Sequence, residues 1–179
     1  MKESDTQRSG DDERVVATLL GRRPAGRYEV VLRRRDGAPV VIANAPLLFD
    51  GTPMPTRYWL VDPALRDEVS RLESRGGVRE AEAAVDPAEV ADAHRRYAEG
   101  RDALVPPDHR GPRPSGGVGG TRRGVKCLHA HLAWWLVGGD DPVGRWTAGR
   151  LGLPPDDPLQ ERAAGRQPDA GSDGPTAAS

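Results

Sequence analysis

The chain has 179 residues, 26 Lys and Arg against 27 Asp and Glu, a net charge of -1, and only 36% hydrophobic residues. This length suits one domain with tails, and the charge balance excludes a uniformly basic nucleic-acid-binding protein, although not a local basic patch. The single cysteine excludes an internal disulfide and a zinc site made only of cysteines. The sequence shows no apolar run of about 20 residues and no signal peptide, so we expect a cytoplasmic protein without a membrane span.

The two ends of the chain are polar and aperiodic. Residues 1–11 lack an apolar pattern, and residues 154–179 are rich in Pro, Gly, Ala and charge. Neither segment can bury enough apolar surface to offset the entropy lost on ordering. We therefore predict two disordered tails around one folded domain over residues 12–153.

The N-terminal half of this domain predicts a short helix followed by three strands. Asp12 can cap a helix that ends at Gly21, since apolar residues recur between them at helical spacing. A Pro-rich loop over residues 50–55 precedes the last strand. A hairpin turn is expected at Asp36 and Gly37. The strands are predicted over residues 28–33, 39–43 and 56–61.

Three Asp-Pro pairs predict helix starts, because Asp caps a helix and Pro suits its first position. They are Asp62-Pro63, Asp86-Pro87 and Asp141-Pro142. A third long helix is expected from about Thr121 through Val137, after a Pro/Gly loop over residues 104–120. The sequence thus predicts an α+β fold: a small, mostly antiparallel three-stranded sheet packed by three longer helices, with short terminal helices.

Charge is segregated along the chain. Residues 14–35 carry a net charge of +6, residues 62–92 a net charge of -5, and residues 101–126 a net charge of +4. The simpler interpretation is that the acidic helices pair with the basic segments. The alternative is that basic surface stays free for an anionic partner.

Residues 116–131 hold five glycines, three basic residues, the only cysteine and two of the four histidines. A glycine turn that leads into a helix N-terminus directs backbone N–H groups at one point, where the helix dipole favours an anion. Neither the Walker nor the dinucleotide pattern is matched, and the alternative is a flexible loop with a solvated basic edge. We predict that this segment binds a phosphate-containing ligand. The predicted anion-binding residues are Gly119, Gly120, Thr121, Arg122, Arg123 and Lys126.

Cys127 and His131 are four residues apart, which places them on one face of a helix. His131 could then activate the thiol as a nucleophile. The same pair could supply two metal ligands completed by His94 or His109, whereas His129 points about 160° away from His131 on a helix. The predicted helix is apolar almost all round, which is typical of a buried, inert thiol. We therefore name Cys127 and His131 as catalytic candidates, predict no metal site, and identify no cofactor.

Four strings of the chain resemble a bacterial family, the domain of unknown function 501 (DUF501), over about residues 14–151. They are DGTPMPT at 50–56, SRLE at 70–73, VKCLH at 125–129 and DPVG at 141–144. The resemblance implies no known activity or cofactor. Genes of such proteins often look like neighbours of those for a septum-formation initiator and an exopolyphosphatase-type phosphatase, so the resemblance implies an association with cell division or polyphosphate.

Many relatives carry further cysteines in the first hairpin and just before the first acidic helix. Here Arg34, Asp36 and Asp62 stand around those places, so we expect a polar or ionic contact there instead. We predict a non-catalytic binding or regulatory protein that recognises an anionic group. The alternatives are an enzyme that uses Cys127 and His131 on a phosphorylated substrate, and a structural partner of the division machinery. Nucleic acid is a less favoured partner.

Overall fold

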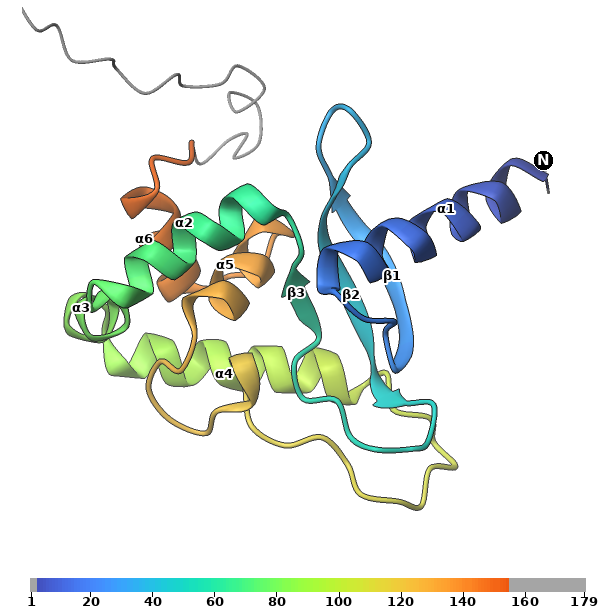
Figure 1. The fold of residues 1–179 in the computed structure, drawn as a ribbon. Helices are drawn as coiled ribbons and strands as arrows, with labels where there is room; N and C mark the ends of the chain where they lie inside the picture. Colours follow the sequence, from blue (N-terminus) through green and yellow to red (C-terminus); the bar gives the residue numbers. More distant parts are fainter. Residues whose placement is uncertain (1–2, 155–179) are drawn as a thin grey trace, which may run out of the picture.

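The computed structural model describes residues 3–154 of the chain (Figure 1). The predicted tail over residues 154–179 lies, apart from Pro154, outside the described residues. One antiparallel sheet and six α-helices make up the fold of the described part, which confirms the α+β class. Among residues 3–154, no helix is long and apolar enough to cross a membrane.

The sheet has three strands, β1 (Gly26–Arg33), β2 (Pro39–Leu48) and β3 (Tyr58–Leu60), with β2 in the centre. Both neighbours of β2 run antiparallel to it. The β1–β2 turn contains Gly37 with a φ of 89°, a conformation that favours glycine, as the hairpin signal predicted. The predicted three-stranded antiparallel sheet is confirmed, although β2 is longer and β3 shorter than expected.

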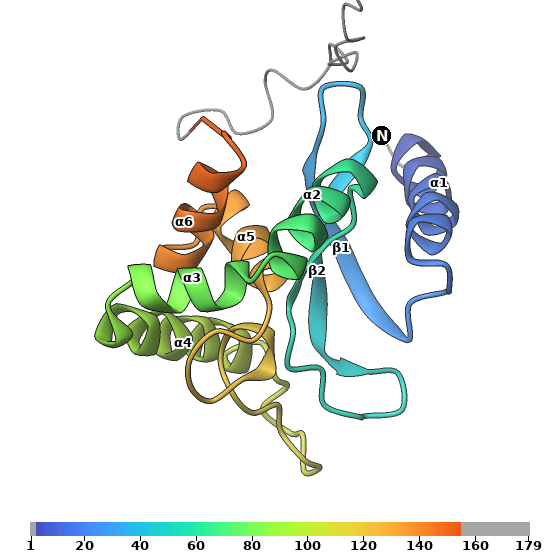
Figure 2. The ribbon, with the colours of Figure 1, turned by 60° about the vertical axis from the view of Figure 1, so that its left-hand side comes forward.

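The two faces of the sheet pack into two different hydrophobic cores. Neighbouring residues of a strand point to opposite faces, and the pair Ile42–Trp59 lies beside the pair Val41–Leu60. Ile42 and Trp59 pack with Val16 of helix α1 (Glu3–Leu20), whereas Val41 and Leu60 belong to the larger core. Figure 2 shows α1 on one side of the hairpin and the other helices on the opposite side.

Helix α1 begins at Glu3, whereas the sequence predicted its start at Asp12 after a disordered tail. Residues 3–11 continue the helix, because each residue added to an existing helix gains one backbone hydrogen bond at low cost. The predicted end is confirmed, since α1 stops at Leu20 and Gly21 follows with a φ of 69°.

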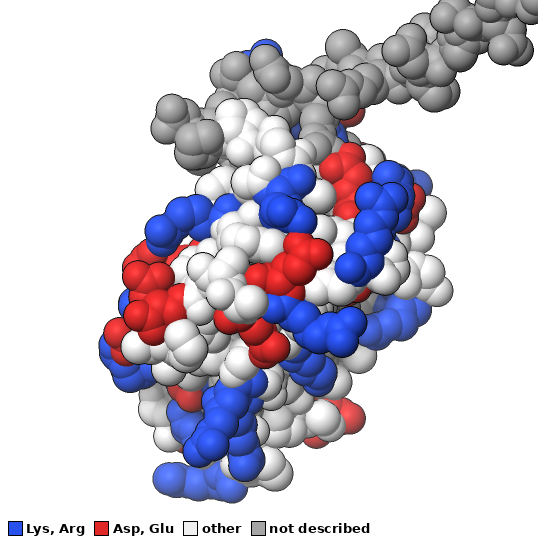
Figure 3. All heavy atoms as spheres, turned by 90° about the vertical axis from the view of Figure 1, so that its left-hand side faces the viewer, with Lys and Arg blue, Asp and Glu red and all other residues white. Residues whose placement is uncertain are grey.

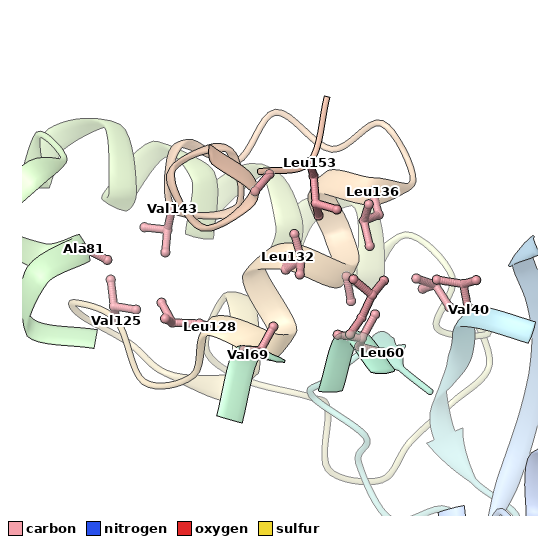
Figure 4. Close-up of a cluster of buried hydrophobic side chains, with 14 of the residues drawn as sticks. Val40, Leu60, Val69, Ala81, Val125, Leu128, Leu132, Leu136, Val143 and Leu153 are labelled. Atoms are coloured by element: carbon pink, nitrogen blue, oxygen red, sulfur yellow. The ribbon is translucent and has the colours of Figure 1, made fainter. Parts of the chain in front are cut away.

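The larger core joins the sheet to the helical half of the molecule, and Figure 4 shows its side chains converging from strands, helices and loops. Leu128, Leu132 and Val143 are fully buried there. Each such side chain contributes about 1.5–3 kcal/mol by leaving water. This core therefore fixes the position of the segment around residue 128 relative to the sheet.

The three Asp-Pro predictions are confirmed in helices α2 (Pro63–Ser74), α4 (Pro87–Asp102) and α6 (Pro142–Arg150). In each case the aspartate side chain accepts a hydrogen bond from the first turn, as in Asp62 with Leu65 N–H. Helix α3 (Gly77–Ala84) was not predicted, because Gly76 and Gly77 resemble a stop signal. Gly76 adopts a left-handed conformation with a φ of 94°, which turns the chain into α3.

The predicted helix over residues 121–137 is wrong in its first half. Helix α5 spans Leu128–Leu136, and a single 3-10 turn, η1 (Val118–Gly120), lies in the loop before it. Cys127 occupies the N-cap position of α5, with extended backbone angles of φ -155° and ψ 117°, and its side chain makes no capping hydrogen bond. Thr121 thus does not start a helix, and Cys127 does not lie inside one.

Candidate functional site

The glycine-rich segment forms a closed loop and does not feed a helix N-terminus. Gly117 N–H donates to the Thr121 carbonyl at 2.7 Å, and the Thr121 hydroxyl donates to the Arg123 carbonyl at 2.9 Å. Gly119 and Gly120 lie between them with positive φ values of 66° and 74°. Because α5 begins only at Leu128, the predicted convergence of the helix dipole with Gly119, Gly120 and Thr121 is not formed.

His94 of α4 holds the two ends of this loop. Val118 N–H donates to His94 Nδ1 at 3.0 Å, and His94 Nε2 lies 2.9 Å from the Gly124 carbonyl. A carbonyl only accepts, so Nε2 carries the proton and the imidazole is neutral. Burial lowers the pKa of His94 and favours this neutral form, ahead of the opposing hydrogen bond to Gly124. A Cβ at Gly117 would collide with the His94 ring, which explains the glycine there.

Arg122 and Arg123 lie at a cavity of about 430 Å³ between this loop, α4 and the end of α3. The cavity has an apolar wall that includes Val85 and Val90, and Glu82 also lines it. Neither arginine side chain forms an ion pair or hydrogen bond with another described residue. Glu82 forms no ion pair with either arginine in the described part of the chain, and its Oε1 accepts the Val125 N–H at 2.8 Å. The pocket thus combines apolar surface with two unpaired guanidinium groups.

The predicted anion-binding residues do not all lie at this cavity. Lys126 is exposed and lies outside the lining of this cavity. A second hollow, of about 820 Å³, is lined by residues of α1, β1 and β2. Its Arg33 is paired with Asp12 at 2.6 Å, and its Arg57 donates to the Asn44 carbonyl. Two of the arginines that line the larger hollow thus have partners, whereas neither arginine of the smaller cavity has one among the described residues.

Cys127 and His131 are not brought together. His131 Nδ1 lies 2.7 Å from Asp141 Oδ2, and both side chains are fully buried. Nε2 of His131 has no hydrogen-bond partner among the described residues. Cys127 instead contacts His129, with 3.7 Å between Sγ and Nδ1. The catalytic pairing predicted from helical spacing fails because Cys127 lies before the helix in an extended conformation.

Glu73 of α2 completes a cluster with Cys127 and His129. Its Oε1 accepts Leu128 N–H at 2.6 Å, so it caps α5, and it lies 3.2 Å from His129 Nδ1. One ligand atom from each of the three side chains lies within 4.8 Å of the other two. All three residues are half-buried, so the cluster is shielded but open to small solutes.

The far side of the His129 ring is fixed by α2. Nε2 lies 3.1 Å from the Arg66 carbonyl and 3.3 Å from the Ser70 hydroxyl. Burial alone would lower the pKa of His129, but the hydrogen bond and charge of Cys127, the charge of Glu73 and the Arg66 carbonyl raise it overall. Since the carbonyl can only accept, Nε2 carries a proton and Nδ1 faces the thiol and the carboxylate.

The expected ionic contact in place of the relatives' cysteines is present. Arg34 donates to both oxygens of Asp62, from Nε at 2.5 Å and from Nη2 at 2.8 Å. Asp36 does not join it and instead accepts Ala38 N–H in the hairpin turn.

Sequence reasoning missed Glu73 and His129 as partners of Cys127. Glu73 stands 54 residues before Cys127, so no local spacing reveals the contact. The useful signal was Cys-x-His, because an extended residue followed by a first helical turn brings Cys127 and His129 together. A continuous helix over residues 121–137 would place Cys127 and His129 on different faces, so the predicted helix hid this contact.

The sheet, the helices around it and the two clusters define a small α+β protein with an arginine-lined cavity and a separate cysteine, histidine and glutamate group. The chain belongs to the family described as Protein of unknown function (DUF501), whose model matches residues 30–149. This confirms the resemblance expected from the sequence. No curated protein and no solved structure matches the chain significantly.

Proposed function

We propose that the protein is a binding or regulatory protein that recognises a phosphate-type anion with Arg122 and Arg123 at the mouth of the 430 Å³ cavity. The observation that carries this proposal is the pair of unpaired guanidinium groups beside an apolar wall. Arginine presents a planar fork of donors that suits phosphate oxygens. The ligand predicted by this arrangement has an anionic group joined to an apolar or aromatic body, as a nucleotide does.

The cavity has the size of ordinary ligand sites, which measure about 300–1,000 Å³. The loop that carries the arginines is held at both ends by His94, so little ordering is needed on binding. The roles of Gly119, Gly120, Thr121 and Lys126 become indirect in this proposal. The glycines and Thr121 shape the loop, and Lys126 adds charge.

Calorimetric titration with inorganic phosphate, polyphosphate and nucleotides at low and high salt tests the proposal. We expect binding that weakens with salt, because exposed charges are screened within about 10 Å at 0.1 M. The double variant Arg122→Ala/Arg123→Ala should bind at least ten-fold more weakly, since a hydrogen bond from a charged donor is worth about 1.5–3 kcal/mol. Polyphosphate in this panel also tests the link that the family resemblance implies.

The matched control is Arg23→Ala/Arg35→Ala, which removes the same charge from exposed loops on either side of β1. It should leave affinity within two-fold. A second variant, Ala91→Phe, extends a side chain from the cavity lining, and we expect it to weaken nucleotides more than inorganic phosphate. Equal binding by the Arg122/Arg123 variant, or no binding of any of these anions at low salt, contradicts the proposal.

A further inference from the structure

The cluster of Glu73, Cys127 and His129 offers three different metal-ligating atoms from two elements that the core holds together. We propose that these residues form a binding site for Zn²⁺ or a similar divalent transition metal, with a fourth coordination position open. The proposal is independent of the anion site, which uses Arg122 and Arg123 earlier in the loop that ends at Cys127.

The spacing of the ligand atoms fits a metal ion. Zinc bonds are about 2.0–2.1 Å to nitrogen, about 2.3 Å to sulfur and about 2.0–2.2 Å to oxygen, so tetrahedral ligand atoms lie about 3.3–3.7 Å apart. His129 Nδ1 lies 3.2 Å from Glu73 Oε1 and 3.7 Å from Cys127 Sγ. These two distances are within a few tenths of an ångström of the ideal values, and all three ligand atoms lie within 4.8 Å of one another.

The surroundings of His129 favour ligation. A metal-bound histidine usually donates its second ring N–H to a carbonyl or carboxylate, which fixes the tautomer and the ring plane. The Arg66 carbonyl, 3.1 Å from Nε2, occupies that position. Nδ1 is thereby left as the ring atom that faces the point that Cys127 and Glu73 share.

The ligand types select the class of metal. A thiolate and an imidazole favour zinc and its neighbours in the transition series, whereas magnesium and calcium prefer oxygen ligands. Among residues 3–154, no fourth His, Cys, Asp or Glu completes the group. Three protein ligands and an open position are typical of zinc sites that bind water or an exogenous ligand. The half-buried cluster gives such a ligand access.

Titration of the full chain with Zn²⁺, and with Co²⁺ as a spectroscopic substitute, tests the site. We expect one ion per chain, a thiolate-to-cobalt charge-transfer band, and a higher unfolding temperature, because a ligand that binds only the folded state stabilises it. Zinc should slow the labelling of Cys127 by thiol reagents at least ten-fold. Affinity should fall with decreasing pH, since the metal must displace a proton from Nδ1 of His129 and from the thiol.

Two variants separate ligation from folding. Glu73→Gln keeps an acceptor for Leu128 N–H, and Cys127→Ser keeps the size of the side chain, so both should fold. We expect each to weaken Zn²⁺ at least ten-fold, and Cys127→Ser to abolish the charge-transfer band. Glu82→Gln is the matched control. Like Glu73, Glu82 accepts a hydrogen bond from a backbone N–H, that of Val125, but Glu82 lies outside the cluster. It should leave Zn²⁺ affinity within two-fold.

A wild-type chain that binds neither ion at micromolar concentrations near neutral pH overturns the proposal, as does unchanged affinity in folded Cys127→Ser. Arg122→Ala/Arg123→Ala should bind Zn²⁺ like the wild type. The zinc titration and the anion titration can therefore fail separately, and each tests its own proposal.

Discussion

The Asp62 side chain makes two interactions at once. It caps α2 through Leu65 N–H at 2.9 Å, and it accepts both donors of Arg34 from the hairpin. Burial alone would raise the pKa of Asp62, but the Arg34 hydrogen bonds, the Leu65 N–H and the Arg34 charge lower it overall. The ionised carboxylate is thus favoured by folding. Its contribution to stability is present above the unfolded pKa, about 3.9, and is lost as pH falls through the folded value.

We predict that Asp62→Asn destabilises the protein by about 1–3 kcal/mol at pH 7, because Asn can still cap the helix but leaves the largely buried Arg34 without its counter-charge. Urea unfolding followed by circular dichroism measures this change. The difference from the wild type should shrink as pH falls below about 3.9, where the unfolded chain binds a proton at Asp62, and through the lower pKa of the folded protein.

Asp67→Asn is the control for charge alone, since Asp67 is exposed on the same helix. It should shift the free energy of unfolding by less than about 0.5 kcal/mol. Equal effects of the two variants would show that the Arg34 contact contributes no stability.

Local signals explain which elements could be predicted. The starts of α2, α4 and α6 are encoded by adjacent Asp-Pro residues, so the sequence is sufficient there. The start of α5 is set by Glu73, which accepts Leu128 N–H from another helix. No pattern near Thr121 reveals this contact. The apolar run from Leu128 was correctly assigned to helix, and only its N-terminal boundary depended on tertiary structure.

The loop that carries the arginines depends on α4 through His94, and we predict that His94→Phe makes it mobile while keeping a buried ring. Leaving the buried Val118 N–H without an acceptor should cost about 1–3 kcal/mol. Anion affinity should fall with an unchanged salt dependence, since no arginine is removed. Calorimetric titration of His94→Phe and of Arg122→Ala/Arg123→Ala distinguishes the loss of loop positioning from the loss of arginine charge.

Acid provides a second readout for His94. Its lowered pKa means that its contribution to stability is complete above about pH 6.5 and is lost as pH falls through the folded value. The variant should lack that part of the acid sensitivity. His109→Phe is the control, because His109 lies in the Pro-rich loop and its ring contacts the nearby Pro112 carbonyl, at 3.0 Å from Nε2. An identical acid profile for His94→Phe and wild type would contradict the role of His94.

Acidic and basic side chains are interspersed on the face of the molecule that Figure 3 shows. Arg34–Asp62 is an ion pair between the basic segment 14–35 and the acidic segment 62–92. Other acidic residues pair elsewhere, such as Glu80 with Arg150 at 2.5 Å. The simpler interpretation of charge segregation therefore holds for part of the surface, while Arg122 and Arg123 stay unpaired within the described chain. Composition predicted the charge balance, but only the fold shows which cations remain free.

The folded domain should end at Leu153, the boundary that the sequence predicts. Leu153 is 5% exposed and packs in the larger core, and its N–H donates to the Ala148 carbonyl at 2.9 Å. We predict that a chain ending at Pro154 unfolds at the same temperature as the full chain. A chain ending at Gly152 should lose about 1.5–3 kcal/mol, because it exposes the apolar surface that Leu153 covers. Differential scanning calorimetry of the three chains tests this, and a lower unfolding temperature for the chain ending at Pro154 would place part of the folded domain beyond residue 154.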